Sequence, residues 1–143
     1  MKNFDNLKLE NQLCFPLYVC SKEIIKKYKP FLDELDLTYT QYITMLVLWE
    51  KSELTLIELG KFLFLDSGTL TPVLKKLEEK NFLKRSRSKD DERNLVISIT
   101  EKGKLLKQKA KSIPSKISTC TNLTDQEALT LYKLLYKILL NFK

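Results

Sequence analysis

The chain contains no histidine, and glycine, proline and cysteine are scarce, with 3, 4 and 3 residues among 143. The lack of histidine excludes the Ser–His and Cys–His pairs of nucleophilic enzymes and most zinc sites. So few turn-forming residues argue against an all-β fold, which needs frequent turns. An odd number of cysteines without regular spacing does not form a disulfide framework.

Long apolar runs and phosphate-binding loops are also missing from the sequence. No stretch reaches the roughly 18 apolar residues that a membrane-spanning helix needs, and the opening MKNFDNLKLENQ lacks the apolar centre of a signal peptide. Neither G-x-x-x-x-G-K nor G-x-G-x-x-G occurs. We therefore expect a cytoplasmic protein that is not an enzyme and holds neither a cofactor nor a metal.

The chain does carry a surplus of positive charge. Its 25 Lys and Arg against 18 Asp and Glu give a net charge of +7. This charge suggests an acidic partner, either nucleic acid or an anionic membrane, and does not choose between them. The length and the 43% hydrophobic content are those of one globular domain with a real core.

Capping boxes mark the start of three helices, because each precedes an apolar stripe of helical period. The three boxes are Thr38-x-x-Gln41, Thr55-x-x-Glu58 and Thr124-x-x-Glu127. The full pattern predicts helices over 13–27, 38–49, 55–63, 68–80, 101–111 and 125–141, with a helical turn near 30–35. Pro16 requires the first helix to begin close to Leu13 or to be kinked, and Pro114 is expected to end the fifth.

Between residues 82 and 100 the apolar period changes from helical to alternating. Segments 82–86 and 95–100 read as two strands, separated by the charged residues 87–94. The sequence therefore predicts a β-hairpin that directly follows a pair of helices.

The short helix, the tight connection 64–67 and the next helix form a helix-turn-helix pattern, and the hairpin forms a wing. Such a second helix enters the major groove of DNA with its first residues at base edges. Helix capping and a solvated hairpin tip would explain each feature singly, but their combination favours double-stranded DNA as the partner. The candidate contacts are hydroxyls, lysines and wing arginines: Ser67, Thr69, Thr71, Lys75, Lys76, Arg85, Arg87 and Arg93.

The first and last predicted helices carry wide apolar stripes. A compact head made of the helix-turn-helix and the wing would not bury all of these side chains. We expect the two helices to form a two-fold homodimer on a pseudo-palindromic operator, with recognition helices roughly 34–36 Å apart; an extended core within one chain is the alternative. The predicted fold is mainly α with a small β-hairpin wing, a winged helix-turn-helix. Residues 1–143 form one domain, with the head at about 38–100 and dimerisation helices at about 7–37 and 101–143.

Four segments carry a family resemblance: LENQLCF, KKYKPFLDELDLTYTQY, LDSGTLTPVLKKLE and DDERNLVISITEKG. They resemble the MarR family of winged-helix regulators, and more narrowly its organic hydroperoxide resistance regulators, over nearly the whole chain. The resemblance implies a dimeric repressor whose N-terminal thiolate is oxidised by an organic hydroperoxide, which alters the DNA-binding heads. It places the sensing cysteine at Cys14, the tyrosines that reach it from the partner subunit at Tyr28 and Tyr39, and the wing arginine at Arg93.

Cys14 also suits a peroxide sensor on chemical grounds. The thiolate is the nucleophile, and the free amides of a helix N-terminus favour it. Hydroxyls of Tyr28, of Tyr39, and of Tyr18 one turn further on can donate to it. The alternative is that Cys14 and the tyrosines only fill the core; the motif match favours the sensor.

A sulfenic acid formed at Cys14 would need a second thiol to resolve it. Cys20 lies on another face of the same helix and is expected only to pack. Two-cysteine relatives carry their second cysteine in about the region of Cys120, which implies a disulfide between subunits; a small cellular thiol is the other route. Two other functions stay open: a repressor gated by a small aromatic ligand in the dimer crevice, and a basic helical protein that binds a membrane or a protein partner.

Overall fold

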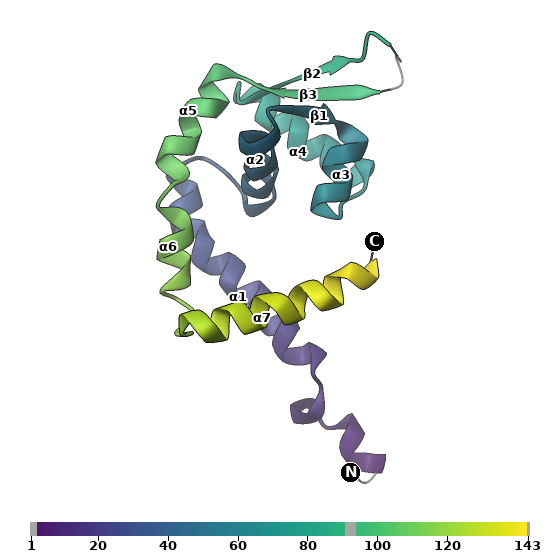
Figure 1. Cartoon of the computed structure of the whole chain (residues 1–143), viewed down its shortest axis with the longest axis vertical. Helices are drawn as coiled ribbons and strands as arrows, with labels where there is room; N and C mark the ends of the chain where they lie inside the picture. Colours follow the sequence, from purple (N-terminus) through teal and green to yellow (C-terminus); the bar gives the residue numbers. More distant parts are fainter. Residues whose placement is uncertain (1–2, 91–93, 143) are drawn as a thin grey trace.

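The computed structural model of this chain describes residues 3–90 and 94–142. A head built from the middle of the chain lies above two long descending segments, and the last helix crosses below the head (Figure 1). The head contains α2 (Tyr39–Lys51), β1 (Glu53–Thr55), α3 (Leu56–Leu63), α4 (Ser67–Glu79), β2 (Leu83–Arg87) and β3 (Leu95–Ile99). The remaining elements are η1 (Asn3–Leu7), η2 (Leu9–Asn11), α1 (Cys14–Asp33), α5 (Glu101–Ala110), α6 (Ile113–Ser118), α7 (Asp125–Leu139) and η3 (Leu140–Phe142).

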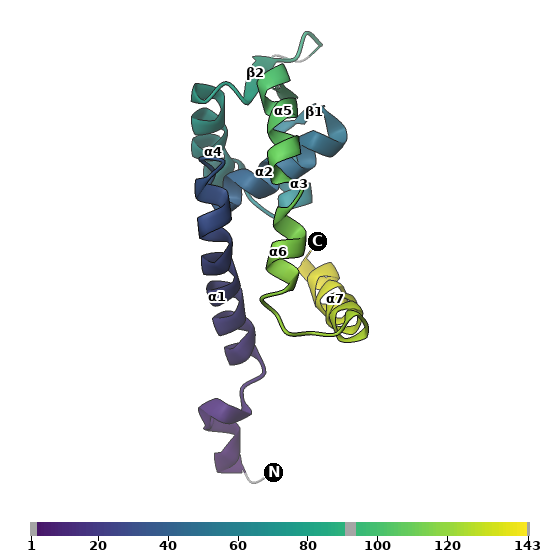
Figure 2. The same ribbon diagram turned by 90° about the vertical axis from the view of Figure 1, so that its left-hand side faces the viewer.

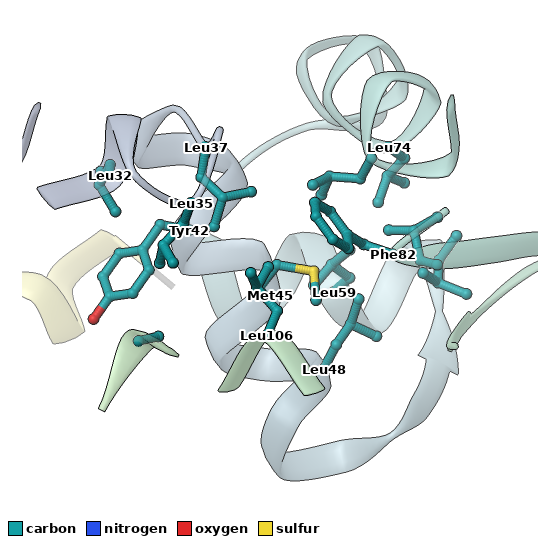
Figure 3. Packing of buried hydrophobic residues seen from close by; sticks show 14 of the residues in the cluster. Leu32, Leu35, Leu37, Tyr42, Met45, Leu48, Leu59, Leu74, Phe82 and Leu106 are labelled. Carbon is teal, nitrogen blue, oxygen red and sulfur yellow. The ribbon is translucent and has the colours of Figure 1, made fainter. Parts of the chain in front are cut away.

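The hydrophobic core lies where the helices of the head meet the sheet. Met45 and Leu48 from α2 pack with Leu59 from α3 and Leu74 from α4, and all four side chains are fully buried (Figure 3). The core extends toward the carboxyl end of α1 through Leu32. Met45, Leu59 and Leu74 belong to the apolar stripes that the helical spacing predicts.

The sheet has three strands in the order β1-β3-β2, all antiparallel. Ile97 at its centre pairs with Leu54 on one side and with Arg85 on the other, and its side chain is buried. The hairpin of β2 and β3 is confirmed. Strand β1 is an addition, because three residues are too few to show an alternating pattern.

All three predicted capping boxes are formed in the structure. Each threonine hydroxyl accepts a hydrogen bond at 3.2 Å from the backbone amide three residues on, and the side chain of that residue accepts from the threonine amide. The starts of α2, α3 and α7 are therefore determined locally, as the sequence indicates.

Near two of the prolines, the helix boundaries in the structure differ from the predicted ones. Helix α1 does not end at Lys27 but continues to Asp33 through Pro30, so the separate turn near 30–35 is wrong. Packing of Leu32, only 2% exposed, holds the helix together across the missing amide. Pro16 lies in the first turn, where a missing amide costs no helical hydrogen bond, and Pro114 opens α6, a short helix that the sequence pattern does not predict.

Across residues 3–90 and 94–142, helix length and hydropathy never combine in the way that crossing a membrane requires.

Candidate functional site

The connection between α3 and α4 is a tight turn with specific local requirements. Phe64 ends α3 in the left-handed conformation, with φ of 56°. A Cβ at Gly60 would lie 2.7 Å from the backbone oxygen of Leu65, so only glycine allows the chain to approach this closely. Asp66 then caps α4 by accepting a hydrogen bond from the Thr69 amide at 2.7 Å, which lowers the pKa of this carboxyl group. The turn therefore fixes the direction in which α4 leaves.

Helix α4 separates a buried face from an exposed polar face. Leu70, Leu74 and Leu77 anchor it in the core with no exposed surface. The predicted contacts on α4 lie outside this buried stripe, and all of them are exposed: Ser67, Thr69, Thr71, Lys75 and Lys76. The hydroxyl of Thr71 donates to the Ser67 carbonyl at 2.7 Å and keeps its acceptor lone pairs outward.

The base of the wing is tied to α4 by Arg85. Its guanidinium lies 3.1 Å from the Glu78 carboxylate, and its backbone amide donates to the same group at 2.7 Å. The backbone hydrogen bond is the main reason why the pKa of Glu78 is lowered. Arg87 is exposed further along the strand, whereas Arg93 lies outside the described residues. The charge of Arg85 is thus used inside the head, which sequence spacing does not reveal.

Cys14 is the first residue of α1, and its thiol is exposed. Tyr18, one turn on, is 61% exposed, and the Lys22 ammonium lies 5.0 Å from its ring centre. The first three turns of α1 therefore present a thiol, a phenol and a cation at the surface of the chain.

Tyr28 and Tyr39 are brought together, but not with the Cys14 of their own chain. Their ring centres are 5.0 Å apart, and Tyr42 completes the cluster at 5.8 Å from Tyr28. Burial and the two neighbouring phenols raise the pKa of Tyr28 to about 12, and burial raises the pKa of Tyr39. At neutral pH these phenols are hydrogen-bond donors. The sequence motifs do not single out Tyr42; its position three residues after Tyr39 on one helical face is the signal that identifies it.

The distance along α1 decides how the thiol and the cluster can meet. Cys14 and Tyr28 are fourteen residues apart in one helix, about 21 Å at 1.5 Å per residue. A single chain therefore separates the two halves of the predicted thiol site.

Cys120 lies just after α6 beside the middle of α1. It borders a small cavity of about 120 Å³ together with Ile24 and Lys27, and its Sγ is 3.5 Å from the Lys116 carbonyl oxygen. Ile24 is ten residues beyond Cys14, about 15 Å along the helix. This is much farther than the Cα separation of about 4.4–6.8 Å that a disulfide requires, so Cys120 does not meet Cys14 within one chain.

Helix α7 and most of α1 expose apolar side chains instead of burying them. None of the residues of α7, all of which the structure describes, is buried. In α1 only Leu32 is buried, and Leu13 near its start is 74% exposed. The large apolar side chains left exposed on α7 are Leu129, Leu131, Tyr132, Leu134, Leu135, Tyr136 and Ile138. An apolar surface of this extent is typical of a protein–protein interface.

Comparison with known proteins identifies relatives of this chain. Residues 26–110 match the family model for the transcriptional regulator SarA/Rot. The organic hydroperoxide resistance transcriptional regulator of Bacillus subtilis is 49% identical over 136 residues, 95% of this chain and 92% of that protein. The HTH-type transcriptional regulator SarZ of Staphylococcus aureus is 50% identical over 124 residues, 87% of this chain and 84% of SarZ.

Solved structures of AbfR, a protein of Staphylococcus epidermidis, show the same fold. Overoxidised AbfR bound to DNA is 36% identical, with a TM-score of 0.78 over 100% of both chains. The disulfide form of AbfR is 35% identical and superimposes with a TM-score of 0.65 over 96% of this chain and 93% of that chain. This chain belongs to the MarR family of winged helix-turn-helix transcriptional regulators, in the branch of the organic hydroperoxide resistance and SarA/Rot regulators.

Proposed function

We propose that this regulator binds operator DNA as a homodimer and loses affinity for it when an organic hydroperoxide oxidises Cys14. The observation that carries the proposal is the separation of Cys14 from the tyrosine cluster along α1, together with the exposed apolar side chains of α1 and α7. A site that one chain holds in two distant halves becomes complete when a second copy supplies the other half.

The DNA-binding part of the proposal rests on the exposed face of α4. Hydroxyls of Ser67, Thr69 and Thr71 at the start of the helix have the size and chemistry to reach base edges and phosphates. Lys75 and Lys76 lie one to two turns further along and suit phosphates. Arg87 and Arg93 of the wing are assigned to the backbone or the minor groove, whereas Arg85 positions the wing through Glu78.

Dimer formation is assigned to α1, α5, α6 and α7. We divide the chain into a DNA-binding head at about 38–100 and two dimerisation segments, the arms, at about 7–37 and 101–143. A groove of about 980 Å³ between α3 and Phe142 leaves room for elements of a second copy. Dimerisation doubles the net charge of +7 and makes DNA affinity steeply dependent on salt.

The thiol site is proposed to form between Cys14 of one copy and Tyr28 and Tyr39 of the other. Their raised pKa values keep both phenols protonated, so that they can donate hydrogen bonds to a thiolate. Phe15 and Leu17, exposed beside Cys14, supply apolar walls that favour an organic peroxide.

The chemistry is a two-electron oxidation of sulfur. The thiolate attacks one peroxide oxygen, the S–O bond forms as the O–O bond breaks, and the alkoxide leaves and takes up a proton as an alcohol. The resulting sulfenic acid condenses with a second thiol to give a disulfide and water. Cys120 of the partner copy and a small cellular thiol are the two candidate resolving thiols, and Cys20 is not assigned a role.

The test is DNA binding before and after one equivalent of an organic hydroperoxide, with a fragment selected from random DNA by the reduced protein. We expect wild type and Cys20→Ser to lose about tenfold or more in affinity, within the usual range of coupling between sites, and Cys14→Ser to bind without responding. Non-reducing electrophoresis separates the two resolving routes, because only the Cys120 route gives a covalent dimer that Cys120→Ser removes. A Cys14→Ser protein that still releases DNA on oxidation would contradict the proposal.

A further inference from the structure

Lys80 connects two parts of the chain that the proposed function needs to move together. It is the C-terminal cap of α4, and its side chain, 25% exposed, crosses to the turn between α1 and α2. Its ammonium group donates to the Asp36 carbonyl oxygen and to Gln41 Oε1 at 3.2 Å, and lies 3.5 Å from the Asp36 carboxylate. Every other lysine ion pair in the described part of the chain joins residues at most four positions apart.

The acceptors of Lys80 belong to a tightly fixed turn. Gln41 Oε1 also accepts the Thr38 amide at 3.0 Å, so Lys80 and the capping box of α2 share one oxygen atom. Gln41 is only 3% exposed. Asp36 has a left-handed φ of 56° between the buried side chains of Leu35 and Leu37. A displacement of this turn cannot leave Lys80 unaffected.

The turn between α1 and α2 also borders the tyrosine cluster. Tyr39 and Tyr42 lie in the first turn of α2 on either side of Gln41, and Tyr28 reaches them from α1. In the view of Figure 2, α4 lies above the carboxyl end of α1, and Lys80 at the end of α4 contacts the turn that follows α1. Gln41 of the capping box thus contacts Lys80 directly and lies between Tyr39 and Tyr42 in the sequence.

We propose that Lys80 is a positioning residue that transmits the state of the thiol site to the recognition helix α4; this inference rests on the proposed function. A change at the tyrosine cluster moves the first turn of α2, and Lys80 pulls the carboxyl end of α4 with it. Leu70, Leu74 and Leu77 pack α4 into the core as one rigid element, so a displacement of its carboxyl end is carried to its amino end. Thr69 is eleven residues from Lys80, about 16 Å along the helix, and Lys80 needs no contact with DNA.

The test compares three variants that keep the aliphatic stem or the charge. Lys80→Met keeps the stem and removes every donor, and Lys80→Arg keeps a cation with several donors. Lys104→Met is the matched control, because the Lys104 ammonium pairs with Glu101 on its own helix, at 3.0 Å. For each protein, DNA affinity is measured reduced and after hydroperoxide, Cys14 sulfenic acid is quantified by mass spectrometry, and thermal unfolding reports folding.

We expect Lys80→Met to bind DNA within about threefold of wild type when reduced and to form the sulfenic acid normally. On oxidation it should lose less than about threefold in affinity, against about tenfold or more for wild type and for Lys104→Met, a change on the scale of allosteric coupling. Lys80→Arg should respond as wild type does.

A Lys80→Met protein that responds fully to oxidation would overturn the inference. Loss of reduced-state binding in both Lys80→Met and Lys80→Arg would also overturn it, because Lys80 would then serve folding or DNA contact. If wild type forms the sulfenic acid and keeps its DNA affinity, the proposed function itself is wrong, and the inference falls with it.

Discussion

Leu74 of α4 and Leu135 of α7 both lie on the apolar stripe of an amphipathic helix, yet Leu74 is fully buried and Leu135 is 40% exposed. The same contrast holds for their surroundings. The head forms a core together with α5, α6 and the carboxyl end of α1, whereas α7 and the amino-terminal half of α1 present their apolar side chains to the outside. The contrast indicates that the head takes its stability from one chain, and that α7 and the start of α1 take theirs from two.

The largest expected effect is in the arms. Leu135→Glu would place an unpaired carboxylate in the interface between copies, and a buried unpaired charge costs several kcal/mol, about 3–5 when one partner of a buried pair is removed. We expect the dimer dissociation constant to rise by about a hundredfold or more, as measured by analytical ultracentrifugation. Lys133→Glu, which introduces the same charge at a polar position of the same helix, is the control. An unchanged dimer in Leu135→Glu would remove the contrast between the two regions.

In the head, Leu74→Ala should destabilise the fold and leave association intact. Removing a fully buried leucine side chain lowers the free energy of unfolding by about 2–5 kcal/mol. Leu46→Ala, the same substitution at a position of α2 that is 42% exposed, is the matched control and should change the free energy of unfolding by about 1 kcal/mol or less. Urea titration at two protein concentrations measures both effects. If Leu74→Ala lowers the free energy of dimer association more than the free energy of unfolding, the stability of the head does not come from its own core.

Lys75→Ala tests whether DNA binding and the response to hydroperoxide depend on different residues. Removing a phosphate contact should weaken binding to all DNA sequences alike and reduce the slope of log affinity against log salt by about 1. The response to hydroperoxide should stay unchanged, because Lys75 lies on the exposed face of α4. Fluorescence anisotropy over a salt series gives the slope, with Lys107→Ala on α5 as the control. Sequence-selective weakening would assign Lys75 to a base rather than to a phosphate.

The smallest effect concerns the junction between head and arms at high pH. Folding raises the pKa of Tyr28 to about 12, above the value of about 10 that an unfolded tyrosine has. Between these values the unfolded chain releases a proton that the folded chain retains, so stability is complete below pH about 10 and falls as the pH rises toward 12. Tyr28→Phe should make this fall shallower in denaturant titrations at successive pH values. An equal fall in both proteins would place the titration elsewhere.

The sequence predicts where helices start better than how far they extend, for a physical reason. The starts of α2, α3 and α7 depend on side chains within three residues, and the capping boxes display those contacts directly. Pro30 misleads because packing of Leu32 against the head, a tertiary contact, carries α1 past it. The length of α1 therefore could not be read from the local pattern.

The candidate site divides in the same way. The exposed face of α4 follows from helical period, so Thr69, Thr71 and Lys75 lie where the sequence places them. The ion pair of Arg85 with Glu78 and the reach of Lys80 to Asp36 join residues on separate elements. Only the folded chain brings such pairs together, and no spacing in the sequence indicates them.

The central claim is that each thiol site takes its cysteine from one copy and its tyrosines from the other, and a mixed dimer tests this most directly. One chain carries Cys14→Ser, and the other carries Tyr28→Phe with Tyr39→Phe. If sites form between copies, the mixed dimer keeps one intact site, and its single Cys14 reacts with organic hydroperoxide at the wild-type rate in stopped-flow measurements. If sites form within one chain, Cys14 of the mixed dimer reacts only at the slow rate of the double tyrosine variant, and that result would contradict the account.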